Sequence, residues 1–191
     1  MRAGDLGDLS DPTGDSAILE WIDGKLQIHH GRDHRVMTND PPYDEQLALV
    51  DYWKGVDPRE FLPGTARAPD RFIRAGTYID MAEQSDDPRI AAASVFSVVR
   101  NASVPYGISI PGAPNLSTTR WRVVADQKSL NYYVESAVSP NTFWVDLTKL
   151  DFSEGAPVRK LDLGLDMAEV QSGEVSGDFV GSVPFLFEPA D

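Results

Sequence analysis

The stretch from residue 16 to residue 30 constrains the fold most, because it has the pattern of a β-hairpin. Residues 16–22 (SAILEWI) are dense in β-branched and aromatic residues, and residues 25–30 (KLQIHH) return after Asp23-Gly24. Asp-Gly is among the strongest short signals for a two-residue hairpin turn. A second turn at residues 31–33 leads into residues 35–39 (RVMTN), for which we expect a third strand. Two consecutive hairpins predict an antiparallel sheet.

Helical spacing replaces strand spacing after Asp40-Pro41-Pro42, since proline cannot donate to a sheet ladder. The apolar periodicity predicts helices over residues 43–53, from Pro69 to about residue 82, and over residues 88–100. The positions expected in the core are Leu47, Val50 and Trp53 in the first helix, Phe72, Ile73, Ala75, Tyr78, Ile79 and Ala82 in the second, and Ile90, Ala93, Val95 and Val98 in the third.

The C-terminal third returns to strands. Residues 101–117 contain several Gly and Pro and predict a long loop, followed by strands at 118–125, 129–136 and 143–147. From residue 151 the tail holds nine acidic residues against two basic ones, and we expect it to wrap the surface. The order strands, helices, strands favours the α+β class, with helices packed on antiparallel sheet.

The charge balance excludes some partners. The 191 residues include 30 acids against 17 Lys plus Arg, a formal net charge of −13. Such a surface repels phosphate backbones and anionic lipids, so neither nucleic acid nor a membrane is an expected partner. The first 15 residues lack the apolar region of a signal peptide. The chain has no cysteine, so it has neither disulfides nor a cysteine nucleophile of its own.

Four segments, in the same order, resemble the choloylglycine hydrolase family, which includes penicillin V acylases and bile salt hydrolases. They are GDSAILEWIDGKLQIHHGRDHRVMTNDPPYDEQL, FLPGTARAPDRFIRAGTYI, STTRWRVVADQKSLNYYVES and FWVDLTKLDF. The resemblance implies an N-terminal-nucleophile (Ntn) hydrolase with an αββα sandwich. It also implies that residues 16–191 are the C-terminal part of a single Ntn domain, lacking the N-terminal cysteine. Residues 1–15 are rich in Gly and Asp, and we expect them to form a flexible lead-in.

Two site residues follow from the resemblance by position. Asn39 matches the Asn of the family's T-N-x-P motif, whose amide helps to form the oxyanion hole. Arg71 matches the first Arg of D-R-F-x-R, which faces the nucleophile in relatives. Read without the family, Asn39 is a turn residue before Asp40-Pro41, and Arg71 belongs to a solvated charged face with Arg67 and Arg74.

No metal or other cofactor is expected. On a strand His29 and His30 point to opposite sides, and His34 lies across a turn, so we interpret the three as hairpin surface and edge residues.

The resemblance implies hydrolysis of a linear amide C–N bond by a cysteine mechanism in the full-length parent, and we expect this chain alone to be inactive. The candidate substrates are penicillin V, acyl homoserine lactones and conjugated bile acids. The alternative is a non-catalytic truncated or split-enzyme subunit that binds a partner chain carrying the cysteine. The expected protein partner is therefore the missing N-terminal half, or other copies of this chain in a homo-oligomer. Related Gram-negative proteins are often periplasmic, but these residues do not indicate a compartment.

Overall fold

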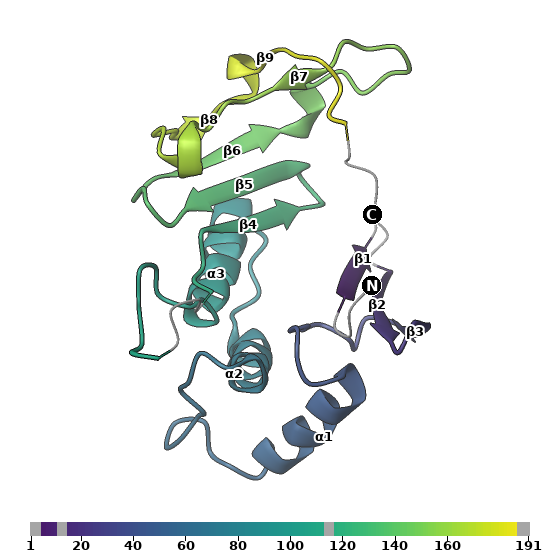
Figure 1. Ribbon diagram of the computed structural model, residues 1–191, viewed down its shortest axis with the longest axis vertical. Coiled ribbons are helices and arrows are strands. Elements are labelled where there is room, and N and C mark those ends of the chain that lie inside the picture. The colour runs from purple at the N-terminus through teal and green to yellow at the C-terminus, as the bar shows by residue number, and fades with distance from the viewer. Residues whose placement is uncertain (1–4, 11–14, 113–116, 187–191) are drawn as a thin grey trace. The chain divides into compact units, whose positions relative to one another are not determined.

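The computed structural model describes residues 5–10, 15–112 and 117–186, and it forms two compact units, residues 1–119 and 120–191. The first unit combines a three-stranded antiparallel sheet with three α-helices, and the second is built of strands and short 3-10 turns (Figure 1). The α+β class is therefore confirmed. Among the described residues, no helix is long and apolar enough to cross a membrane.

The predicted hairpin is present. Strands β2 (Ser16–Ile22) and β3 (Lys25–His30) pair antiparallel, and Asp23 and Gly24 both have the positive φ that this turn requires, 49° and 75°. Within the segment expected to be a lead-in, strand β1 (Asp5–Ser10) pairs with the other side of β2. A Gly- and Asp-rich segment can do this because a sheet ladder joins backbone groups.

The prediction of a third strand at residues 35–39 is wrong. These residues form neither a strand nor a helix. Their polar groups bond to the helices instead. The Thr38 hydroxyl lies 2.6 Å from Gln46 Oε1 and 3.1 Å from the Ala68 carbonyl oxygen, and Val36 and Met37 pack against the core. The segment therefore runs between sheet and helices and carries Asn39 at its end.

All three predicted helices form, as α1 (Tyr43–Trp53), α2 (Ala68–Met81) and α3 (Pro88–Asn101), and α2 contacts both of the others. The Asp87 carboxylate caps α3 by accepting from the Arg89 N–H at 2.9 Å. The core of this unit consists of Ile18, Tyr43, Phe72 and Ile73. It places one face of the sheet against α1 and α2.

The prediction of which α3 residues are buried is largely wrong. Val98 is buried as predicted, but Ile90 and Val95 are 51% and 47% exposed, and Ala92 and Phe96 are buried in their place. The helix is apolar over most of its circumference, so its periodicity does not select a face. Packing against α2 makes that selection.

The second unit is a four-stranded sheet in the order β4-β5-β6-β8, with a two-stranded sheet, β7 and β9, beside it in the same unit. The bounds are Trp121–Asp126 (β4), Asn131–Ser136 (β5), Thr142–Asp146 (β6), Arg159–Lys160 (β7), Gly173–Glu174 (β8) and Val180–Gly181 (β9), with 3-10 turns at Leu147–Lys149, Leu165–Met167 and Ser176–Asp178. Strands β4, β5 and β6 agree with the predicted positions.

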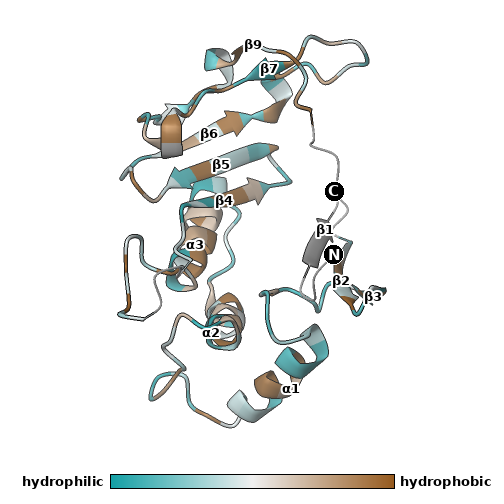
Figure 2. Cartoon of the chain, viewed as in Figure 1, coloured by the Kyte–Doolittle hydropathy of each residue, from teal (hydrophilic) through white to brown (hydrophobic). Residues whose placement is uncertain are grey.

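The acidic tail contributes to the core of this unit as well as to its surface. Figure 2 shows hydrophobic stretches along β6, where Phe143 and Val145 are buried. Tail residues pack against this cluster, among them Leu161, Met167 and Phe179. Apolar residues between the acids thus cover one face of β5 and β6.

Candidate active site

Asn39 and Arg71, which are 32 positions apart, meet in the structure. Arg71 Nη2 donates to Asn39 Oδ1 at 2.8 Å, and Arg71 Nε donates to the Ala66 carbonyl oxygen at 3.1 Å. Asn39 is exposed, and Arg71 is partly buried. The two residues taken from the family motifs therefore form one polar pair at the first turn of α2.

This contact determines which way the Asn39 amide points. A guanidinium can only donate, so it holds the amide oxygen Oδ1 and leaves the Nδ2 group, with its two N–H bonds, directed elsewhere. Burial lowers the pKa of Arg71, and repulsion from Arg74 lowers it further, but an arginine remains protonated at neutral pH. The pair thus presents a cation and an oriented amide donor side by side.

Arg74 belongs to the supporting structure of this pair and not to a solvated charged face. It is buried, and its Nη1 donates to the carbonyl oxygens of Pro63 and Thr65 at 2.7 and 2.9 Å. Its Nε donates to Asn101 Oδ1 at 3.1 Å, at the end of α3. Arg74 therefore ties α3 to the loop before α2, which also provides the carbonyl group that Arg71 bonds.

The sequence analysis did not predict a buried carboxylate at the start of α1. Glu20 on β2 accepts the Tyr43 backbone N–H at 3.0 and 3.3 Å, at the first residue of α1. A carboxylate is favourable there because the N–H groups of a helix N-terminus are otherwise unpaired and carry partial positive charge. A Glu on the buried face of a strand, in register with Ile18, is the signal that could have indicated it.

Two of the three histidines are not the hairpin surface and edge residues that the sequence predicted. His29 and His34 lie around Tyr43, with ring centroids 4.6 and 5.4 Å from the Tyr43 ring, and His34 Nδ1 is 3.1 Å from its hydroxyl. His30 is exposed, at 3.1 Å from Asp15. No cluster of three metal-ligating side chains occurs in the described part of the chain. The histidines pack around an aromatic ring because α1 docks on this face of the sheet.

Tyr43 gives this region a pH dependence. Burial, with a smaller effect of Asp44, raises the pKa of Tyr43 from 10.0 to about 12. The unfolded chain therefore loses this proton first as the pH rises, so the stabilisation is complete below pH 10 and is lost towards pH 12. We expect about 2 kcal/mol of unfolding free energy to disappear over this range.

Urea unfolding of Tyr43→Phe at pH 9 to 12 tests this. The variant should lose less stability than the parent above pH 10, whereas Tyr52→Phe, which changes an exposed ring on the same helix, should behave like the parent. An equally steep alkaline decrease in Tyr43→Phe would contradict the assignment.

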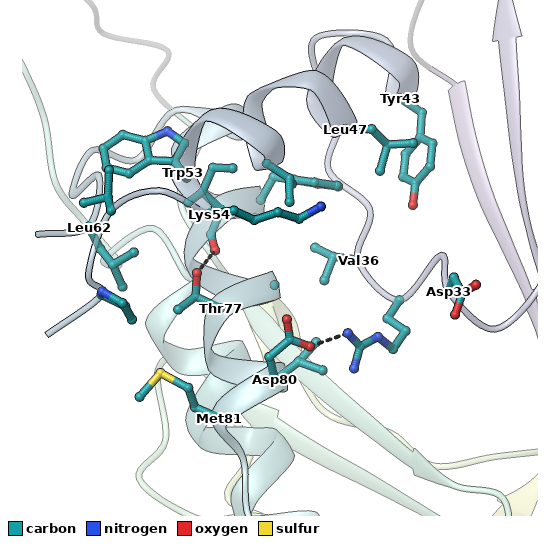
Figure 3. A pocket seen from close by; sticks show the side chains of 18 residues that line it. Asp33, Val36, Tyr43, Leu47, Trp53, Lys54, Leu62, Thr77, Asp80 and Met81 are labelled. Carbon is teal, nitrogen blue, oxygen red and sulfur yellow. Dashed lines mark hydrogen bonds and ion pairs between the residues drawn. The ribbon is translucent and has the colours of Figure 1, made fainter.

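A cavity of about 350 Å³ lies between α1 and α2 (Figure 3). Leu47, Trp53, Leu62 and Met81 form part of its apolar lining, and the charged residues Lys54 and Asp80 also line it. Neither Asn39 nor Arg71 is among the residues that line it. The cavity is therefore separate from the polar pair.

A sequence model described as linear amide C–N hydrolases, choloylglycine hydrolase family, matches residues 8–62 and 60–160. The chain is also 49% identical, over 192 aligned positions, to a penicillin V acylase of Pectobacterium atrosepticum. That match covers 94% of this chain and 51% of the relative, so the chain spans about half the length of the curated relative it matches.

Solved structures of two such hydrolases are also similar to this chain. The penicillin V acylase of Agrobacterium tumefaciens superposes with a TM-score of 0.88 at 52% identity, covering 96% of this chain and 58% of that one. A conjugated bile acid hydrolase variant of Clostridium perfringens gives 0.65 at 20% identity, covering 75% and 50%, which shows a shared fold. The expected resemblance to the choloylglycine hydrolase family is confirmed.

Proposed function

Because the chain belongs to the choloylglycine hydrolase family of linear amide C–N hydrolases, we propose that it is the C-terminal part of a cysteine amidase. The chain contains no cysteine and spans about half of its relatives' length. The nucleophile is accordingly assigned to the part that these relatives have in addition. On its own the chain is inactive in this proposal, and both of its compact units belong to one Ntn domain.

The hydrogen bond between Arg71 and Asn39 is the observation that supports the site most directly. Attack of a thiolate on the amide carbonyl carbon places negative charge on the carbonyl oxygen. An amide N–H held in position stabilises that charge without having to reorient during the reaction. With Oδ1 bound to Arg71, the free Nδ2 of Asn39 is the donor for this role.

The remaining steps complete an acyl transfer. The C–N bond breaks as the amine leaves with a proton, and the acyl group remains as a thioester on the cysteine. Water then attacks the thioester, releases the carboxylate and restores the thiol. In this scheme Arg71 orients Asn39, and its positive charge also favours the thiolate over the thiol.

Among the three candidate substrates, we propose penicillin V first. The relatives at 49% and 52% identity are both penicillin V acylases. Acyl homoserine lactones and conjugated bile acids, which also carry a linear amide, remain the second and third candidates.

The alternative is a binding role, in which the chain is a non-catalytic or split-enzyme subunit. The face of β2 and β3 turned away from the helices carries Leu19, Trp21, Leu26 and Ile28, and Leu26 and Ile28 are 47% and 59% exposed. An exposed apolar sheet face favours association with another polypeptide. The partner proposed is a cysteine-bearing N-terminal half, and self-association into a homo-oligomer is the next possibility.

The decisive experiment combines this chain with the N-terminal half of the Agrobacterium tumefaciens acylase, to which this proposal assigns the nucleophilic cysteine. Penicillin V hydrolysis is followed as release of primary amine, and association is measured by analytical ultracentrifugation. We expect hydrolysis by the mixture and by neither half alone.

The matched control is the same N-terminal half with its cysteine replaced by alanine, which should associate equally well but give no hydrolysis. A complex that forms with the intact cysteine and cleaves none of the three substrates would support the binding role. Hydrolysis by the isolated chain would contradict the proposed division of the site.

A further inference from the structure

The segment that carries Asn39 is held by one fully buried side chain, Gln46 on α1. Gln46 Nε2 donates to the carbonyl oxygen of Thr38 at 3.0 Å and to that of Pro41 at 2.6 Å. These two carbonyl groups stand on either side of Asn39 in the chain. One side chain therefore bridges the ends of the short segment from which Asn39 projects.

The segment around Asn39 needs hydrogen-bond donors from a side chain such as Gln46. Residues 38–41 lie outside any strand or helix, and Pro41 and Pro42 have no N–H with which to form a ladder. Their carbonyl groups still require donors where they are buried. A glutamine amide has two donors and an acceptor, and here the donors bind Thr38 and Pro41 while Oε1 lies 2.6 Å from the Thr38 hydroxyl.

The same network links the segment to the helix that carries Arg71. The Thr38 hydroxyl is 3.1 Å from the carbonyl oxygen of Ala68, the first residue of α2. Gln46 and Thr38 thus relate Asn39 to the first turn of α2, from which Arg71 reaches back to the Asn39 amide at 2.8 Å. A change at Gln46 would move Asn39 relative to Arg71 while leaving both residues intact.

We propose that Gln46 is a positioning residue, which sets the place and orientation of the Asn39 amide through its bonds to the carbonyl groups of Thr38 and Pro41. The proposal rests on the function given above in one respect only, namely the catalytic role of Asn39. The geometry itself, that Gln46 maintains the contact of Asn39 with Arg71, can be tested without any reaction.

The first test is therefore spectroscopic and uses the chain alone. In ¹⁵N NMR spectra, the Asn39 side-chain amide signals are identified by their loss in Asn39→Ala. In Gln46→Met, and in Gln46→Glu, which keeps the shape but not the two donors, these signals should shift towards those of a free asparagine. Ser176→Ala, which removes a buried hydroxyl of the second unit, should leave them unchanged. Unchanged Asn39 signals in a folded Gln46 variant would overturn the proposal.

The second test is kinetic and uses the chain combined with the N-terminal half. Gln46→Met should lower kcat by about tenfold to a hundredfold, the order expected when a catalytic group is misplaced, with little change in KM. In an Asn39→Ala background the same substitution should have almost no further effect, because it acts through Asn39. Independent, multiplicative losses would contradict the positioning role. If the signals shift as expected and no enzyme activity is found, the proposed function fails and the geometric inference stands.

Discussion

Replacing Asn39 with alanine in the reconstituted enzyme should lower kcat by about 10²- to 10³-fold, as expected for removing one oxyanion donor. The physical reason is the arrangement of the amide, whose Oδ1 is held by Arg71 so that Nδ2 is already oriented. KM should change little, because this donor acts mainly on charge that develops in the transition state. Initial rates over a range of penicillin V concentrations separate the two constants.

Two further variants make this result specific. Asn39→Asp keeps the shape and the contact with Arg71 but replaces the donor by a negative oxygen, so it should be at least as damaging as alanine. Asn141→Ala removes the side-chain amide of an asparagine just before β6 in the second unit and should leave kcat unchanged. A kcat of Asn39→Ala close to that of the parent would exclude Asn39 from the oxyanion site and leave it a turn residue.

Replacing Arg74 with methionine should lower the stability of the protein strongly. The buried guanidinium donates to the carbonyl oxygens of Pro63 and Thr65 and to the Asn101 side chain. Methionine fills a similar volume but leaves these acceptors without a donor. We expect the free energy of unfolding to fall by about 3 kcal/mol, since hydrogen bonds from a charged group and buried unpaired acceptors each count for 1–3 kcal/mol.

Urea unfolding at neutral pH measures this effect, and Arg89→Met is the matched control. Arg89 is exposed and pairs with Asp87 on the surface, an arrangement that contributes roughly 0–1 kcal/mol. Arg74→Lys should fall between the two, because an ammonium group can reach some but not all of the same acceptors. Equal destabilisation by Arg74→Met and Arg89→Met would show that burial of Arg74 has no energetic consequence.

Local sequence signals predicted the elements well where a backbone rule acts over a few residues. Asp23-Gly24 indicated the hairpin because its turn needs two residues with positive φ. Asp87-Pro88 indicated the start of α3, since an aspartate accepts from the free N–H groups and proline is tolerated in the first turn. The family motifs indicated Asn39 and Arg71, and their roles in catalysis remain proposals.

The errors arose where a residue's environment depends on distant parts of the chain. Residues 35–39 have strand-forming composition, but Thr38 bonds to α1 and α2 in place of a neighbouring strand. Arg74 was grouped with exposed charges, because no local pattern shows that the carbonyl groups of a loop will surround it. Ile90 was expected to be buried because α3 is apolar on more than one side.

The sequence by itself determined the α+β order of elements, the hairpin turn, the helices and the family, because these depend on short-range backbone preferences, side-chain spacing and ordered motifs. Only the tertiary structure decided that Arg71 orients the Asn39 amide and that Gln46 bridges the segment carrying Asn39. Those contacts join residues on separate elements. A hydrogen bond between them exists only when packing brings donor and acceptor within about 3 Å, and no local pattern encodes that distance.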